Sequence, residues 1–448
     1  MKQTLKIEKY KKALFTPLNI IIIYLFASIL LYFFGPIKWN IDNGLLLFSY
    51  VSINYICIWL GYRRMMRRAI YNEYGYWCYD DDDGGDEIPY YSKLFTCILL
   101  FTIVCNLTYS FFEYGGISID RILNMAQSYL NNRDFEATHN IFTRIFTYLW
   151  GLNYFYLPCG IVLYKRLKIL DKVLFWIALL TNIFFWLSIG TMKGLGDILI
   201  TAIVPFIVVT VKGKIDAWEV KKALNKRKYT LLILGILFAI VFGYSALNRY
   251  ILRGHNDFSA LNTLTRPFAK EEILWPFPYI TNSIIAYVSH GYTGLAYALK
   301  LPFKWTFFVG NSRALTNIIE RKLLDGSNVI SSITYVQRLQ DVYGWKNGSI
   351  WPTAFTWLAS DFSFILLPAL MFFMGYFWAK CIYEALVKNN VISLVMASYL
   401  SIFFFYLPCN NQILQSERSF WAMILITILY LNNTSRRPLA LGKRVIRF

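Results

Sequence analysis

Long uncharged runs of apolar residues alternate along the chain with short polar connections that carry most of the charge. Several of these runs reach about 17 residues, the length that an α-helix needs to cross the hydrocarbon core of a bilayer. We predict ten spans, at about 14–34, 44–61, 94–112, 142–164, 173–190, 195–211, 230–247, 353–379, 391–408 and 413–431. The pattern therefore predicts an all-α polytopic membrane protein.

The composition supports this class and narrows the chemistry. The 448 residues are 57% hydrophobic and only 16% charged, so a soluble fold of this size would lack the polar residues to cover its surface. The seven cysteines form no CxxC pair, and the chain has only three histidines. We therefore expect no disulfide framework, no metal site and no cofactor.

The net charge of +19 is explained by topology rather than by nucleic acid. Basic residues cluster before the first span and after spans 2, 4, 6 and 10, and all of these loops fall on one side of the membrane. The positive-inside rule then predicts that both termini are cytoplasmic. Segment 281–299 is also apolar, but a span there would move the basic C-terminal tail outside. We therefore interpret it as an amphipathic or re-entrant helix.

This topology divides the chain into three parts. Residues 1–247 form a bundle of spans 1–7, residues 248–352 form a large helical extracytoplasmic loop, and residues 353–448 form spans 8–10 with a basic cytoplasmic tail. The large loop contains aromatic residues and prolines, as in "WPFPY" at 275–279, and is predicted to fold as a cap on the outer side.

The first candidate site follows span 7, in "LNRYILRGHNDF" at 247–258. Arg249 and Arg253 are four residues apart, so one further helical turn places both guanidinium groups on one face. His255 and Asp257 follow at the membrane surface. Two interpretations are open: the arginines bind a diphosphate at headgroup depth, or they anchor a helix end to lipid phosphates.

Other charged residues are predicted on the same side. Lys193 lies in a glycine-rich turn, and Arg313 and Arg338 lie in the large loop. Residues 419–431 are too few to cross a membrane, so Glu417 and Arg418 must lie inside span 10 near its outer end. They either pair with each other or with a neighbouring helix, or face a polar cavity.

Two aspartates lie close to the predicted outer ends of spans. Asp361 is about two turns inside span 8, where a carboxylate is either functional or an ion-pair partner of an arginine. Asp197 opens span 6, where the helix dipole favours a capping role. His290, on the apolar face of 281–299, is expected to be a packing histidine rather than a base.

Two motifs carry a family resemblance. The segment "WLASDFSFILLPALMFFMG" (357–375) and the turn "GTMKGLGDILI" (190–200), together with the large late outer loop, resemble the Wzy-type oligosaccharide repeat-unit polymerases of O-antigen and capsule synthesis. The resemblance implies the lipid-linked, GT-C-like glycosyltransferase architecture and a place in the bacterial inner membrane. It also implies that repeat units carried on undecaprenyl diphosphate are joined at the periplasmic face. A chain-length regulator and membrane lipids are the implied partners.

The resemblance also suggests roles for the candidate residues. Family members rely on outer-loop arginines, so Arg249 and Arg253 are expected to hold the diphosphate without a metal. We expect Arg253, His255, Asp257 and Asp361 to act in catalysis, the last three as candidate bases. The residues expected to bind substrate are Arg249, Lys193, Arg313, Arg338, Glu417 and Arg418.

Two other functions fit parts of the sequence. A lipid-linked oligosaccharide flippase or transporter would place charges along several span interiors and would favour related halves, but we find no internal repeat. An O-antigen ligase shares the architecture and the lipid donor, and the sequence separates it poorly from a polymerase. A membrane O-acyltransferase would need an intramembrane histidine, and only His290 is available.

Overall fold

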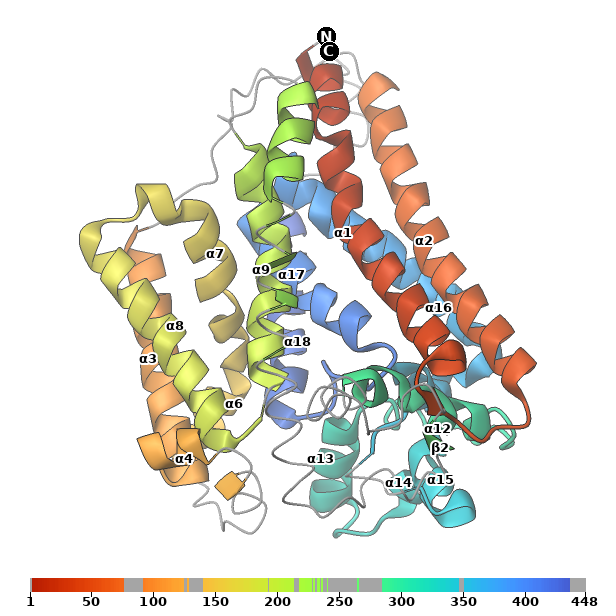
Figure 1. Cartoon of the computed structure of the whole chain (residues 1–448). Coiled ribbons are helices and arrows are strands. Elements are labelled where there is room, and N and C mark those ends of the chain that lie inside the picture. Colours follow the sequence, from red (N-terminus) through yellow and green to blue (C-terminus); the bar gives the residue numbers. More distant parts are fainter. Residues whose placement is uncertain are drawn as a thin grey trace, which may run out of the picture.

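The computed structural model describes most of the chain. The described residues are 2–75, 92–124, 127–128, 140–191, 193–212, 217–227, a few positions between 229 and 240, 264–265, 284–345 and 350–435. Helices dominate this part of the chain, and the strands described are the short antiparallel pair β1 (Ile37–Lys38) and β2 (Leu264–Thr265) (Figure 1).

The described part holds six helices that are long and apolar enough to cross a membrane. They lie within α1 (Lys2–Phe34), α2 (Gly44–Gly75), α3 (Ser92–Tyr114), α8 (Ile169–Ile189), α9 (Lys193–Val211) and α16 (Ala354–Leu386). The chain is thus an all-α membrane protein in this part. The shorter apolar helix α17 (Val391–Tyr406) and the helix α18 (Glu417–Ser435) follow α16.

The expected span at 142–164 is interrupted. It consists of α6 (Ile141–Tyr148), the 3₁₀ turn η1 (Trp150–Tyr154) and α7 (Tyr156–Leu163). Pro158 favours this break, because proline cannot donate a backbone hydrogen bond to the preceding helical turn. The span expected at 230–247 lies largely outside the described residues, so the count of ten spans stays a prediction.

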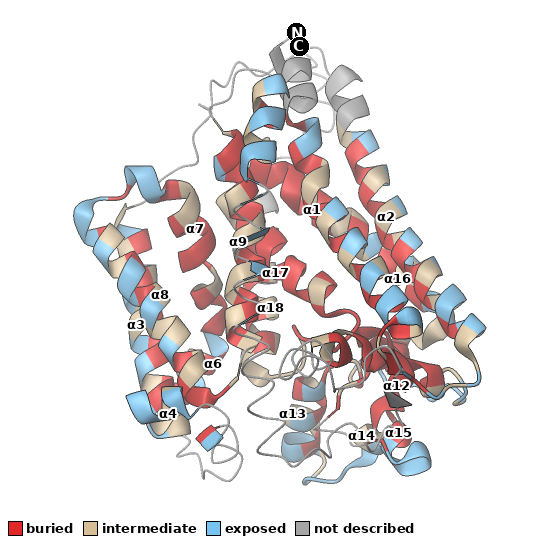
Figure 2. Cartoon of the chain, in the orientation of Figure 1, coloured by how far each residue is buried: buried red, intermediate tan, exposed pale blue. Residues whose placement is uncertain are grey.

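The helix α17 lies at the centre of the bundle. It packs against α1, α7, α9, α16 and α18, and nearly all of its side chains are buried (Figure 2).

The helices α2 and α16 pack against each other along their length. A β-carbon on Gly61 of α2 would lie 1.9 Å from the carbonyl oxygen of Phe372 in α16, so only glycine permits this approach of the two helices.

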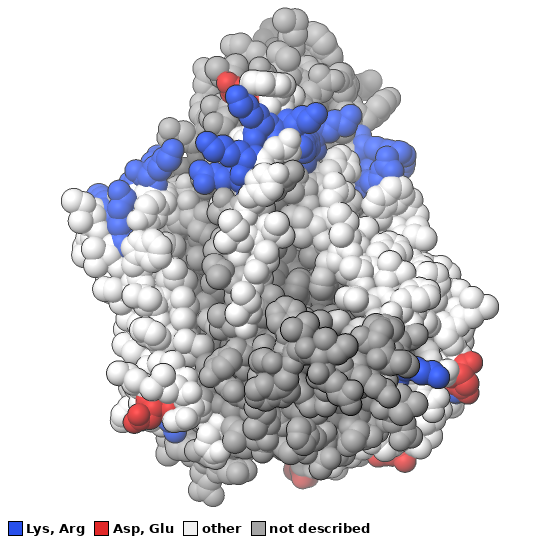
Figure 3. Space-filling model, viewed as in Figure 1, with Lys and Arg blue, Asp and Glu red and all other residues white. Residues whose placement is uncertain are grey.

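Basic residues collect at one end of the bundle, as the space-filling view shows (Figure 3). The N-terminal part of α1, the C-terminal part of α2 and the 3₁₀ turn η2 (Tyr164–Arg166) before α8 contribute to this band. Its described members include Lys11, Lys12, Arg63, Arg64, Arg67, Arg68, Lys165, Arg166, Lys168, Lys221, Lys222 and Lys226.

The described residues of the large loop lie at the opposite end (Figure 1). The helices of this loop are α12 (Gly291–Ala298), α13 (Arg313–Leu323), α14 (Val329–Ile333) and α15 (Tyr335–Tyr343). A further short helix, α4 (Ile119–Leu123), follows α3 at this end. The non-basic end of the bundle therefore carries a folded helical cap.

The segment expected to be amphipathic or re-entrant is buried inside this arrangement. Nearly every residue of α12 is buried, and the helix packs against α2, α15 and α16. The hydroxyl of Tyr292 lies 2.6 Å from those of Ser28 in α1 and Tyr55 in α2. The helix thus joins the cap to the membrane bundle instead of presenting one apolar face to lipid.

Candidate functional site

The turn between α8 and α9 places two opposite charges at the non-basic end. Gly190 ends α8 in the left-handed conformation, with φ 77°, and its N–H is bonded to Leu187. Lys193 then begins α9, and Asp197 lies one turn later with its Oδ2 atom 3.9 Å from the Lys193 Nζ atom. Asp197 is 7% exposed. Asp197 therefore follows the first turn of α9 and pairs with Lys193. It does not occupy the capping position that the sequence predicted.

The guanidinium of Arg418, in the first turn of α18, lies inside a cage of aromatic rings. Its central carbon is 4.8 to 5.9 Å from five ring centroids, which belong to Tyr109, Tyr114, Trp150, Phe185 and Trp186. Nη2 lies 3.1 Å from the hydroxyl oxygen of Tyr114, to which it donates a hydrogen bond. Nη1 is buried without a hydrogen-bond partner.

Lys193 is close to this cage. Its Nζ atom lies 5.8 Å from the centroid of the Trp186 ring, which also contacts Arg418. Lys193 and Arg418 are near enough to repel one another. Among the described carboxylates, that of Asp197 forms an ion pair with Lys193. No described carboxylate forms an ion pair with Arg418. The cluster of Lys193, Asp197 and Arg418, called here the charge cluster, thus carries one positive charge that no carboxylate of the described residues compensates.

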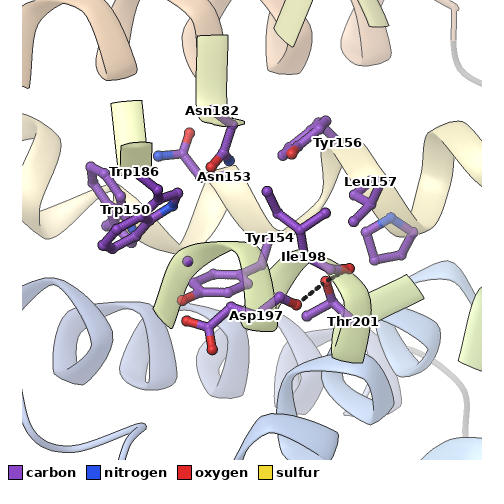
Figure 4. A pocket seen from close by; sticks show the side chains of 12 residues that line it. Trp150, Asn153, Tyr154, Tyr156, Leu157, Asn182, Trp186, Asp197, Ile198 and Thr201 are labelled. Carbon is purple, nitrogen blue, oxygen red and sulfur yellow. Dashed lines mark hydrogen bonds between the residues drawn. The ribbon is translucent and has the colours of Figure 1, made fainter. Parts of the chain in front are cut away.

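A pocket opens beside the charge cluster, between η1, α7, α8 and α9 (Figure 4). Trp150, Tyr154 and Trp186 line it with aromatic rings, and Leu157 and Pro158 line it with apolar surface. The broken helix α6–η1–α7 forms one wall. The interruption at 149–155 therefore shapes the pocket, because a continuous helix would place these side chains elsewhere.

Three pocket residues carry buried acceptor atoms for which the described part of the chain provides no hydrogen-bond partner. These atoms are Oδ1 of Asn153, Oδ1 of Asn182 and Oδ1 of Asp197. A buried acceptor without a hydrogen bond costs about 1–3 kcal/mol. A pocket that combines such acceptors with aromatic rings is suited to a ligand that has many hydroxyl groups.

Gly194 holds the two walls of the site together. A β-carbon at this position would lie 1.9 Å from the indole ring of Trp186, so the ring rests directly on the backbone of α9. The same ring lines the pocket and contacts Arg418. The position of Trp186, and with it the shape of the aromatic cage, thus depends on a glycine.

The structure brings together only some of the residues expected from the sequence. Arg249, Arg253, His255 and Asp257 lie outside the described residues. Lys193 and Arg418 meet in the charge cluster. Glu417 does not pair with Arg418, because it points to the surface and forms an ion pair with Arg321 of α13.

Asp361 has a different environment from the one expected. Its Oδ1 atom accepts a hydrogen bond from the hydroxyl of Thr306, and its Oδ2 atom accepts from the backbone N–H and the side-chain amide of Asn311 at 2.7 and 2.6 Å. No arginine of the described chain pairs with it. Asp361 thus fastens the loop before α13 to α16, which is a structural use of the carboxylate.

The two remaining arginines lie in the cap. Arg313 is exposed, and its guanidinium carbon lies 5.3 Å from the ring centroid of Trp351. Arg338 is 8% exposed, contacts the ring of Tyr335 and has a buried Nη1 atom without a partner. His290 is also buried, its Nδ1 atom lies 2.8 Å from the carbonyl oxygen of Ala286, and burial lowers its pKa. It is a packed, neutral histidine.

Sequence reasoning missed the aromatic cage and the pocket amides. Trp150, Asn153, Asn182 and Trp186 lie in apolar runs without a spacing that marks them. One signal was present: Lys193 and Asp197 are four residues apart directly after a glycine turn, so they share a helix face. Among the described residues, no group of three or more His, Cys, Asp or Glu side chains is placed to hold a metal.

Comparison of the chain with protein-family models, with curated proteins and with solved structures finds no match.

Proposed function

We propose that the chain is a glycosyltransferase that polymerises oligosaccharide repeat units carried on undecaprenyl diphosphate, with the charge cluster and its pocket as the active site. The observation that carries the proposal is the aromatic-caged Arg418. It lies beside Lys193 at a pocket whose acceptor atoms lack partners. The site therefore offers both an anion-binding part and a sugar-binding part.

The anion-binding part consists of Arg418 and Lys193. A desolvated guanidinium without a carboxylate partner is costly, and an anionic ligand offsets this cost with charge-assisted hydrogen bonds. A diphosphate suits the site because its oxygens can accept from Nη1 of Arg418 and from Nζ of Lys193 together. These groups would also stabilise the charge that grows on the diphosphate as it leaves.

The sugar-binding part consists of the pocket. Hydroxyl groups of a sugar can donate to the unpartnered Oδ1 atoms of Asn153, Asn182 and Asp197. The rings of Trp150, Tyr154 and Trp186 offer flat apolar faces, against which the C–H faces of a sugar ring can pack. This combination distinguishes a site for a glycan from a site for a lipid phosphate alone.

Asp197 is the group placed to receive a proton. An acceptor sugar hydroxyl attacks the anomeric carbon, a new C–O bond forms, and the bond between that carbon and the diphosphate oxygen breaks. The diphosphate leaves with the electron pair, and the hydroxyl proton passes to Oδ1 of Asp197. We prefer Asp197 to Asp361 as the candidate base, because both carboxylate oxygens of Asp361 already accept hydrogen bonds.

The charge distribution supports a topology for this reaction. The basic band lies at one end of the bundle (Figure 3). The N-terminal ends of α9 and α18, which carry the charge cluster, lie toward the other end with the cap (Figure 1). By the positive-inside rule the basic end would face the cytoplasm and the site would face the opposite side of the membrane. We propose that this membrane is the bacterial inner membrane. Repeat units would then be joined after they have crossed the membrane.

The test compares gels of the surface polysaccharide from cells in which the chromosomal gene is deleted. These cells carry a plasmid copy that encodes the wild-type protein, Arg418→Gln or the control Arg321→Gln. Arg321 is also an arginine at this end, but it is exposed and pairs only with Glu417 among described carboxylates. We expect Arg418→Gln to leave single repeat units on the lipid anchor without a ladder, while Arg321→Gln retains the ladder. Immunoblots of membranes confirm equal amounts of protein.

Other patterns would overturn the proposal. A full ladder with Arg418→Gln would remove this site from the reaction. Polymer or repeat units that accumulate on the inner membrane in the deletion strain, with no glycan on the surface, would instead indicate a ligase or a flippase.

A further inference from the structure

The loop before α13 exposes a cluster of large aromatic side chains. Phe303, Trp305, Phe307 and Phe308 are 44% to 64% exposed, and Lys304 between them is exposed as well. Thr306, at the centre of the same loop, is completely buried. We call residues 303–308 the aromatic loop. Four exposed aromatic side chains so close together in the chain are unusual on a surface that meets only water.

The aromatic loop is held rigidly in this conformation. Thr306 is tied to α16, because its N–H donates to the carbonyl oxygen of Ser360 at 3.2 Å and its hydroxyl contacts that oxygen and Asp361. Phe307 and Phe308 both have positive φ values, 56° and 62°. Such conformations cost about 1–3 kcal/mol each for bulky residues. Contacts elsewhere in the fold must offset this cost to keep the two rings pointing outward.

The rings continue onto the outer surface of α16. Trp305 packs against Phe307 and Phe308 with centroids 4.7 and 5.5 Å apart, and Phe308 packs against Phe362 of α16 at 5.7 Å. Shortly after Phe362 along α16 come Ile365 and Leu366, which are 87% and 58% exposed. The aromatic loop is thus continuous with apolar side chains of a helix long enough to span the membrane.

The conformation of α16 changes at the same level. Residues 354–361 are all buried in protein, Ser363 has non-helical angles of φ 54° and ψ 161°, and the exposed apolar residues begin after it. The remaining ~23 residues, from Phe364 to Leu386, extend roughly 35 Å at 1.5 Å per residue. This length matches a hydrocarbon core of about 30 Å with a short excess.

We infer that the aromatic loop inserts into the membrane interface of the leaflet at the non-basic end, and that α16 enters the hydrocarbon at Ser363. Aromatic rings favour this interfacial region, and the ammonium group of Lys304 can reach the lipid phosphates. The partner is therefore the lipid surface itself. Asp361 then lies just above the hydrocarbon, within the cap. This inference is independent of the proposed enzymatic function.

The test measures the depth of position 307 with a fluorophore. In a Cys78→Ser, Cys97→Ser background, Phe307→Cys is labelled with an NBD maleimide and the protein is reconstituted into phosphatidylcholine–phosphatidylglycerol vesicles. Cys97 is the exposed thiol of the described chain, and Cys78 lies outside the described residues. The unsubstituted background protein measures residual labelling. Leu323→Cys, at an exposed position near the end of α13, is the matched control.

We expect lipids with a nitroxide at the headgroup or at carbon 5 to quench the label at 307 at least about fivefold more strongly than the label at 323. Iodide in the buffer should show the reverse order. Equal iodide quenching at both positions would overturn the inference. Protection of 307 from iodide without quenching by nitroxide lipid would also overturn it, because a second copy or another protein would then cover the loop.

Loss of folding in one variant does not remove the test. Trp305→Cys reports on the same surface from a residue with ordinary backbone angles, so it avoids the strained positions. The same quenching order is expected there. A label at 305 that follows the pattern of 323 would overturn the inference independently.

Discussion

A β-carbon on Gly194 would lie 1.9 Å from the indole ring of Trp186, and the same ring lies 5.6 Å from the guanidinium carbon of Arg418. The backbone of α9 therefore fixes the aromatic cage by direct contact. This relationship makes the geometry of the charge cluster sensitive to a single uncharged methyl group at the position next to Lys193.

Gly194→Ala should accordingly disturb the site more than the fold. The added methyl group forces Trp186 away from α9, with an overpacking cost of about 1–3 kcal/mol. If the cluster is the active site, a displacement of about 1 Å lowers turnover by about 100-fold. Polymer length and amount on gels measure the activity, and thermal unfolding in detergent measures the stability.

Gly235→Ala is the control for this prediction, because a β-carbon at Gly235 meets nothing within 4 Å. It should keep both the polymer and the melting temperature. A Gly194→Ala protein with normal polymer would show that the position of Trp186 does not matter for activity.

Adjacent residues Glu417 and Arg418 should respond very differently to neutralisation. Glu417 forms an exposed ion pair with Arg321, which is worth less than about 1 kcal/mol. Glu417→Gln should therefore retain polymer and stability, whereas Arg418→Gln should lose polymer. Binding of a radiolabelled polyprenyl-diphosphate oligosaccharide to purified protein separates the two directly, and weak binding by Glu417→Gln would contradict this division of roles.

Asp361 should act through the loop that it fastens. Asp361→Asn replaces one of the two acceptor oxygens with a donor amide, so it opposes the N–H groups of Asn311 or the hydroxyl of Thr306. We expect a loss of about 1–3 kcal/mol in the free energy of unfolding. Chemical denaturation in detergent measures this loss.

A double-mutant cycle with Thr306→Val tests the same attachment. Because the two residues share a hydrogen bond, their effects should be non-additive by at least about 0.5 kcal/mol. Additive effects would mean that Asp361 does not depend on Thr306 and would leave room for a catalytic role.

His290 should make the protein sensitive to acid. Burial lowers its pKa in the folded state, so below the unfolded value of about 6.5 the unfolded chain binds the proton more readily. The stabilising contribution is complete above that pH and is lost as the pH falls through the window below it, by up to about 1.4 kcal/mol per pH unit.

His290→Gln removes this titration and keeps a polar side chain near the Ala286 carbonyl. Melting temperatures of both proteins between pH 7.5 and 5 provide the comparison. The variant should lose less stability on acidification than the wild-type protein. Parallel curves would show that another group controls the acid response.

The sequence predicted the class of fold because that class depends on length and apolarity. Runs such as 14–34 and 195–211 are long enough to be recognised without knowing their neighbours. The break in 142–164 was not predicted, because it depends on the packing of the η1 turn against α18 as well as on Pro158. Periodicity cannot reveal such a contact between distant segments.

The candidate site was predicted only in part, for a related reason. Charged residues such as Lys193 and Arg418 are conspicuous in an apolar sequence, so the sequence points to each of them as a candidate. Their grouping was not predictable, because the position of Arg418 depends on contacts with aromatic rings from three separate elements, α3, η1 and α8. The hydrogen bonds of Asp361 could not be predicted, because its partners, Thr306 and Asn311, lie in a loop about fifty residues earlier in the chain.

The central position of α17 has a consequence for the order in which the protein matures. This helix has almost no surface for lipid, and it needs α1, α7, α9, α16 and α18 around it. The contacts of α17 with α1, α7 and α9 can therefore form only after those earlier helices have already been synthesised. Arg418 emerges later still, on α18, so the charge cluster is assembled only after every other wall of its pocket has been synthesised. A ribosome-bound chain that has not yet released α18 would carry the pocket but not the arginine beside it.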